Sequence, residues 1–180
     1  MAEIKSSIEL AMEKTRGLHL SSEEKEKLQE EELHSKAHNL VSRFLEVDFH
    51  LKEVEKELAK YDPPQREKLE KLVLQYLIEA IQLDRDNDLI FQGIESFQEK
   101  GKRFIKKMRE LIEGYRKREQ KDYHKTEGDL LKKLERQGIS GSAVKPKIEG
   151  SREWEEAIAK FRPAFEAQLH ALKKELGSIQ

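Results

Sequence analysis

Apolar residues recur at alternating steps of four and three along two long stretches of the chain, and this spacing most constrains the fold. An average step of about 3.5 residues keeps one helix face turned toward a partner helix, as in coiled coils. The first ladder contains Leu33, Ala37, Leu40, Phe44, Val47, Leu51, Val54, Leu58 and Tyr61. The second contains Leu69, Val73, Tyr76, Ala80, Leu83, Asn87, Ile90, Ile94, Phe97, Gly101, Phe104, Met108, Leu111 and Tyr115, of which only Asn87 and Gly101 interrupt the apolar pattern. The ladders predict an all-α fold built on a long, coiled-coil-like helical hairpin.

Local signals place the ends of the first hairpin helix. Ser21 and Glu24 have the spacing of an N-terminal capping box. Pro63 and Pro64 push the preceding residue out of the helical region and suit the start of a new helix, so the first helix should end near Tyr61. The short connection makes the two helices antiparallel neighbours.

The second hairpin helix is expected to be continuous from the prolines to about residue 137, where Gly138 ends it. The ladder keeps its phase across residues 84–88, which favours helix over loop there. Asn87 then occupies a seam position, where a buried Asn selects register and partner number. The hairpin therefore spans residues 21–137. The same seam fits closure within one chain or across a homodimer.

Three further segments flank the hairpin. Residues 1–17 are expected to form a short amphipathic helix that packs on the body of the protein, because apolar positions fall on one stripe. That stripe contains Ile4, Ile8, Ala11, Met12 and Thr15. Residues 138–150 are predicted to be a Gly-rich linker, or an extended strap that packs on the helical bundle. Residues 151–177 are predicted to form a C-terminal helix that is capped by Ser151 and kinked at Pro163.

Composition narrows the function classes. The chain is 39% charged and 36% hydrophobic, with a formal net charge of −1, so no overall charge attracts nucleic acid or anionic membrane. It contains no cysteine, which excludes disulfides, thiolate metal sites and cysteine nucleophiles. No apolar run approaches the roughly 20 residues of a membrane span. We therefore expect a cytoplasmic protein without membrane contact.

The segment from Asp84 to Glu95 is the closest match to a metal site. It places carboxylates at Asp84, Asp86, Asp88 and Glu95, which are positions 1, 3, 5 and 12 of a calcium-loop pattern. Leu89 stands where that pattern needs glycine for its sharp turn. An acidic helix surface is the favoured interpretation. A calcium site is one alternative, and an acidic tip on a shorter hairpin, open to a basic partner or to a metal held elsewhere, is another, so helix or turn at residues 84–88 stays open.

His34 and His38 are four residues apart, with Glu30 one turn earlier. Three such ligands on one helix face can hold a transition metal. A solvated helix face is the favoured interpretation here as well. The sequence predicts no resident metal and no cofactor.

Residues 100–125 form a strongly basic stretch, with eleven Lys and Arg side chains against four acidic ones. A solvated helix face that pairs with the acidic first helix is the favoured interpretation, and the alternatives are an acidic protein partner or, with interleaved aromatics, nucleic acid. The exposed basic residues predicted to bind a partner are Lys102, Arg103, Lys106, Lys107, Arg116, Lys117 and Arg118. Ile139 and Val144 of the Gly-rich strap are predicted to bind a partner through apolar contact.

No catalytic motif accompanies these features, so we expect a non-enzymatic interaction protein that acts as scaffold, adaptor or assembly helper. Two alternatives stay open: a nucleic-acid accessory factor that uses the basic stretch, and a metal-binding helical bundle. The identity of the protein partner does not follow from the sequence.

Overall fold

The computed structural model describes residues 21–46 and 50–179. Within these ranges the chain is helical, with no β-strand, so the all-α prediction is confirmed for this part. The predicted helix over residues 1–17 lies outside the described residues. The helices are α2 (Ser22–Phe44), α3 (Leu51–Leu58), α4 (Pro63–Glu79), α5 (Asp88–Phe97), α6 (Lys102–Arg136) and α7 (Arg152–Gly177), with a single 3-10 turn η1 (Glu99–Gly101) between α5 and α6.

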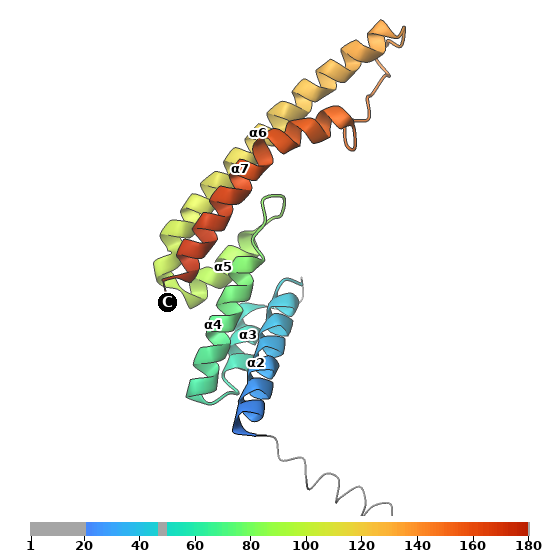
Figure 1. The fold of residues 1–180 in the computed structure, drawn as a ribbon. Helices are drawn as coiled ribbons and strands as arrows, with labels where there is room; N and C mark the ends of the chain where they lie inside the picture. Colours follow the sequence, from blue (N-terminus) through green and yellow to red (C-terminus); the bar gives the residue numbers. More distant parts are fainter. Residues whose placement is uncertain (1–20, 47–49, 180) are drawn as a thin grey trace, which may run out of the picture.

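The helices form a short body and a long arm (Figure 1). The body consists of α2 to α5, with α2, α3 and α4 side by side at one end. The arm consists of α6 and α7, which run antiparallel and extend well beyond the body. The 35 residues of α6 and the 26 of α7 correspond to lengths of about 52 and 39 Å at the usual rise per residue.

The predicted first hairpin helix is wrong in its length. α2 ends at Phe44, and a separate helix α3 begins at Leu51, where the His50 N–H donates to the Glu53 carboxylate at 2.8 Å. The ladder residues of both helices pack into the same core as α4. α4 has only 17 residues, about 26 Å, so a continuous 40-residue helix would leave much of its apolar seam uncovered. Folding back buries Val54 and Leu58 instead.

The predicted continuous second helix is also wrong. α4 ends at Glu79, residues 80–87 form a loop, and α5 begins at Asp88. A second break follows at Gln98, before η1 and α6. The apolar faces of α4, α5 and α6 pack into one shared core, so a ladder of constant phase does not require one continuous helix. In this structure the described apolar residues of the ladders pack in or against one core within a single chain.

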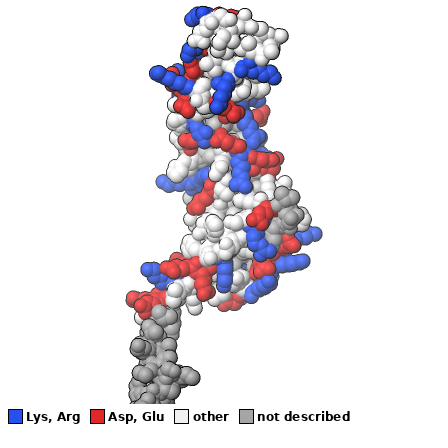
Figure 2. All heavy atoms as spheres, turned by 90° about the vertical axis from the view of Figure 1, so that its right-hand side faces the viewer, with Lys and Arg blue, Asp and Glu red and all other residues white. Residues whose placement is uncertain are grey.

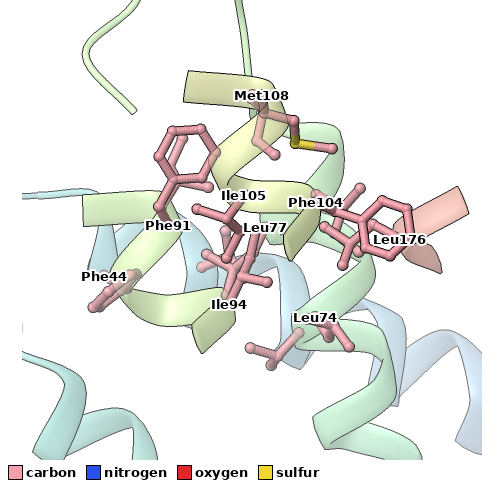
Figure 3. Packing of buried hydrophobic residues seen from close by; sticks show 14 of the residues in the cluster. Phe44, Leu74, Leu77, Phe91, Ile94, Phe104, Ile105, Met108 and Leu176 are labelled. Atoms are coloured by element: carbon pink, nitrogen blue, oxygen red, sulfur yellow. The ribbon is translucent and has the colours of Figure 1, made fainter. Parts of the chain in front are cut away.

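The core joins the arm to the body. Figure 3 shows Leu77 of α4, Ile94 of α5 and Ile105 of α6 close together, and each is at most 1% exposed. Two glycines permit this close packing. A Cβ atom on Gly93 would lie 2.9 Å from the ring of Phe44, and one on Gly101 would lie 2.9 Å from Leu176.

Aromatic contacts hold the two arm helices together. The ring of Tyr115 on α6 lies 5.7 Å from that of Phe161 and 5.6 Å from that of Phe165 on α7. Farther along the arm, Tyr123 and Trp154 meet edge to face at 5.5 Å. These distances suit attractive ring pairs, which add to apolar burial. The arm is therefore a packed unit along much of its length.

The ends of the arm helices follow the sequence signals. The Ser151 hydroxyl accepts a hydrogen bond from the Trp154 N–H at 3.2 Å, as a helix N-cap does. α7 contains Pro163 in its interior, and Figure 1 shows this helix changing direction along its length. The Gly-rich segment 138–150 joins α6 to α7 at the far end of the arm, away from the body.

Candidate interaction site

Residues 81–88, here called the acidic loop, are shaped by one buried side chain. Asn87 is 3% exposed. Its Oδ1 accepts from the Gln82 N–H at 3.0 Å, and its Nδ2 donates to the carbonyls of Gln82 at 2.7 Å and Arg85 at 2.8 Å. These three bonds satisfy backbone groups that a helix would otherwise pair. Asn87 therefore closes a turn and does not set a coiled-coil register as predicted.

Three arginines of the arm hold the acidic loop. Arg162 of α7 donates to Asp84 at 2.8 Å, and Arg109 of α6 pairs with Asp88. Arg116 of α6 donates to the backbone carbonyl of Arg85 at 3.0 Å. Figure 1 shows the loop between α4 and α5 reaching toward the middle of the arm. The loop thus forms a second connection between body and arm, in addition to the apolar core.

Tyr115 lies beneath this contact and is fully buried. Its hydroxyl donates to the Glu119 carboxylate over 3.4 Å. Burial raises the pKa of the Tyr115 phenol well above its usual value, and the nearby carboxylates of Asp84 and Glu119 raise it further. The phenol therefore stays protonated throughout the physiological range and acts as a buried hydrogen-bond donor.

The predicted calcium ligands do not converge. Asp84 and Asp88 pair with arginines, and Asp86 accepts from the Asp88 N–H at 3.0 Å within the loop. In the part of the chain that the structure describes, no group of three or more His, Asp and Glu side chains is placed to hold a metal ion. An arginine beside a carboxylate also opposes cation binding, because the two positive charges repel.

His34 and His38 are brought together by a partner that the sequence did not suggest. Both rings meet Tyr76 of α4 edge to face, at 6.2 and 5.6 Å. Nδ1 of His34 lies 3.1 Å from the Tyr76 hydroxyl oxygen, within hydrogen-bonding distance. The two histidines therefore join α2 to α4, and among the described residues no third metal-ligating side chain completes a site with them.

All seven basic residues predicted to bind a partner lie exposed on α6. Arg116 and Arg118 have partners within the protein, the latter through Asp122 at 2.8 Å. Lys117 pairs with Glu113 at 2.6 Å and Lys102 with Glu99 at 3.4 Å. The cations of Arg103 and Lys107 lie 4.6 and 5.6 Å from the Phe104 ring. Lys106 makes none of these contacts.

The far end of the arm carries the predicted apolar residues. Gly138 adopts a left-handed φ of +81°. Its N–H donates to the Glu135 carbonyl at 2.9 Å, and the Ile139 N–H donates to the Leu134 carbonyl at 3.0 Å. This pair of bonds is a Schellman motif, which fixes the backbone just beyond a helix end. Ile139 is nevertheless 49% exposed, and Val144 is half-buried.

Some residues that join body and arm were not identified from the sequence. Arg109 and Arg162 find their acidic partners only across the fold. Lys173 of α7 is half-buried and donates to the Glu79 carbonyl at the end of α4, at 3.0 Å, where a cation complements the helix dipole. Burial lowers the pKa of Lys173. Local sequence patterns do not predict such pairings.

Comparisons with protein-family models, with curated proteins and with solved structures found no match to this chain. None of the helices described by the structure combines the length and the apolar character that a membrane-spanning segment requires.

Proposed function

We propose that this protein is a non-enzymatic adaptor that docks a partner protein on the end loop of its arm, residues 137–151. The observation that carries the proposal is an exposed isoleucine in the uncharged first half of this loop, at the end of a long, packed hairpin. The body and the rest of the arm then serve to hold that loop away from the remaining surface.

The end loop differs from the rest of the chain in charge. Residues 138–144 contain no charged side chain, although 39% of the whole chain is charged. Figure 2 shows mostly uncharged residues over the far end of the molecule, whereas acidic and basic side chains alternate below it. Interfaces are depleted of charge in their central, most buried part. The uncharged first half of the end loop fits that part of a protein interface.

The end loop is also held in place, which lowers the cost of binding. The Schellman bonds at Gly138 and Ile139 anchor its first residues to α6. At the other side, Ile148 is buried and its carbonyl accepts from the Ser151 N–H at 2.9 Å, just before α7. A loop that is already ordered loses less conformational freedom on binding than a flexible one.

Site-specific photo-crosslinking tests the proposal in cells of the source organism. A photoreactive amino acid replaces Ile139, and the matched control places it at Leu89, an exposed leucine of α5 that is 39% exposed. We expect one discrete protein adduct from position 139 and none from position 89. Adding Val144→Asp to the first variant should reduce that adduct at least tenfold.

Equal labelling from both positions, or none from position 139, would exclude the end loop as a docking site. Circular dichroism of each variant checks that the helical fold is kept, since substitutions at exposed positions typically change stability by less than about 0.5 kcal/mol.

A second candidate function concerns the start of α6. Lys102, Arg103, Lys106 and Lys107 occupy its first two turns, and no acidic residue lies in the first turn. The helix dipole is positive at this end, so cations here lower helix stability. An acidic protein segment bound at this site would offset that cost, and this favours an acidic partner.

Charge reversal distinguishes an acidic protein partner from nucleic acid at the start of α6. Lys106→Glu with Lys107→Glu should abolish capture of a synthetic poly-glutamate peptide without a loss of helix content. Nucleic-acid binding stays a separate prediction. It requires affinity for RNA or DNA that falls steeply with salt and is lost in the same double variant.

A further inference from the structure

An open groove runs between the N-terminal halves of α2 and α4, at the end of the body far from the arm. It has a volume of about 760 Å³. Its apolar lining comes from three half-buried residues, Leu33 of α2, Leu72 of α4 and Tyr61 just before α4, and from Pro64. Charged and polar side chains, Lys68 among them, make up the rest of the lining. The lining thus combines apolar groups with a larger number of charged and polar ones, and an amphipathic helix can meet both kinds with its two faces.

The first half of α2 packs little against the rest of the protein. Every described side chain from Glu23 to Glu32 is exposed, including Leu28 at 47%. The buried residues of this helix all lie in its second half, from Ala37 to Phe44. Helices in proteins gain most of their stability from packing an apolar face. This half of α2 therefore lacks the packing that the other helices have.

We propose that the groove binds the chain's own N-terminal segment, residues 1–17, through its apolar stripe. The segment is joined to Ser21 by three residues, and Ser21 caps the end of α2 at which the groove begins. The tether keeps the local concentration of the segment high, so a small apolar contact suffices for binding. The proposal concerns the opposite end of the molecule from the end loop and stands independently of the proposed function.

The lengths agree with this placement. A helix of 17 residues is about 26 Å long. The α2 part of the groove extends from Glu26 to Lys36, about 15 Å at the same rise. Residues 18–20 have the length of a common helix–helix connection. An antiparallel return then places Met12, Ile8 and Ile4 successively along the groove.

The charges also agree. Residues 1–17 contain three acidic and three basic side chains, so the segment carries no net side-chain charge toward a lining that has both signs. The stripe of Ile4, Ile8, Ala11, Met12 and Thr15 offers apolar groups that match the apolar lining. Burial of such groups stabilises a bound state by about 25 cal/mol for each Å² of apolar surface that is removed from water.

Distance measurement between two spin labels tests the proposal on the full chain. The protein contains no cysteine, so Ser6→Cys and Ser35→Cys introduce two unique label sites. Packed helices lie about 8–10 Å apart, so a docked segment should give a narrow distance distribution below about 30 Å. A broad distribution centred at longer distances would overturn the proposal.

Two sets of variants and a dilution identify the occupant. Leu72→Asp in the groove, or Ile8→Asp with Met12→Asp in the segment, should each remove the short distance, and Leu89→Asp on α5 should keep it. The segment variant leaves the described core untouched, so it applies even where Leu72→Asp unfolds the protein. A tenfold excess of unlabelled chain should leave the short distance unchanged. Its loss on dilution would assign the groove to a second copy and overturn binding within one chain.

Discussion

Replacing Asn87 by leucine separates the two interpretations of the acidic loop. If Asn87 occupied a seam position of a continuous helix, leucine would stabilise the protein, because a polar residue there costs stability. In the structure, Asn87 instead makes three hydrogen bonds to the backbone of Gln82 and Arg85. Asn87→Leu should therefore destabilise the protein.

The size of the loss follows from those three bonds. Each contributes about 0.5–1.5 kcal/mol net, and a buried partner left unpaired costs about 1–3 kcal/mol. Water reaches part of this loop, because Gln82 and Arg85 are exposed. The apolar surface that the leucine side chain buries offsets some of the loss. We expect a decrease of about 2–4 kcal/mol in the free energy of unfolding.

Urea unfolding followed by circular dichroism at the helix band measures this change, with Asn39→Leu on the exposed face of α2 as the matched control. The control should stay within about 0.5 kcal/mol of the parent protein. An Asn87→Leu protein that is as stable as the parent, or more stable, would refute the assignment of Asn87 as a turn-closing residue and restore the continuous helix.

Asn87→Asp gives a second test with nearly the same side-chain size. A carboxylate oxygen would then lie where Nδ2 now donates, 2.7 and 2.8 Å from two carbonyl oxygens. The repulsion should raise the pKa of the new carboxyl group in the folded state. The variant should therefore be less stable than the parent at pH 7, and the difference should shrink as the pH falls toward 4. A difference that does not change with pH would contradict this arrangement.

Three further predictions concern the contacts between arm and body. The raised pKa of the Tyr115 phenol means that its contribution to the free energy of unfolding is complete below about pH 10 and is lost as the pH rises above that value. Tyr115→Phe should therefore make the free energy of unfolding fall less steeply with pH in this alkaline range. If the free energy of unfolding, measured with urea, falls equally steeply with pH for parent and variant between pH 9 and 11, this prediction is wrong. Ile105→Ala should cost about 2–5 kcal/mol, because the side chain is 1% exposed in the shared core; a loss below about 1 kcal/mol would show that the core is not packed as described. Arg162→Gln should cost less than about 1 kcal/mol and less still in 0.5 M salt, because this side chain and that of Asp84 are 39% and 48% exposed; a larger, salt-independent loss would mean that the pair is shielded from water.

The local signals in the sequence identified several helix ends correctly. Ser21 and Glu24 form the predicted capping box, with bonds of 2.8 and 3.1 Å. The two prolines begin α4, Ser151 caps α7, and Gly138 follows the end of α6. Each signal depends on atoms within a few residues along the chain, so the sequence contains all the information that it requires.

The structure shows where the residues predicted to bind a partner or a metal lie. The basic side chains of α6 are exposed as expected, and Ile139 lies at the end of the arm. The four carboxylates of the calcium pattern do not converge, because Arg109 and Arg162 pair with two of them across the fold. Spacing along the chain shows which groups share a helix face, and it does not show which charge arrives from another helix.

The sequence by itself determined that this chain is helical, where its apolar faces lie, and where several helices begin and end. The tertiary structure alone decided that α2 ends at Phe44 and α3 begins at Leu51, that residues 80–87 form a loop, and that these helices pack into one core. A seam of constant phase is buried equally well by one long helix with a partner or by short helices that fold back on one another. The choice depends on which surfaces meet, such as Ile105 against Leu77, and on a turn whose backbone bonds are completed by the Asn87 side chain.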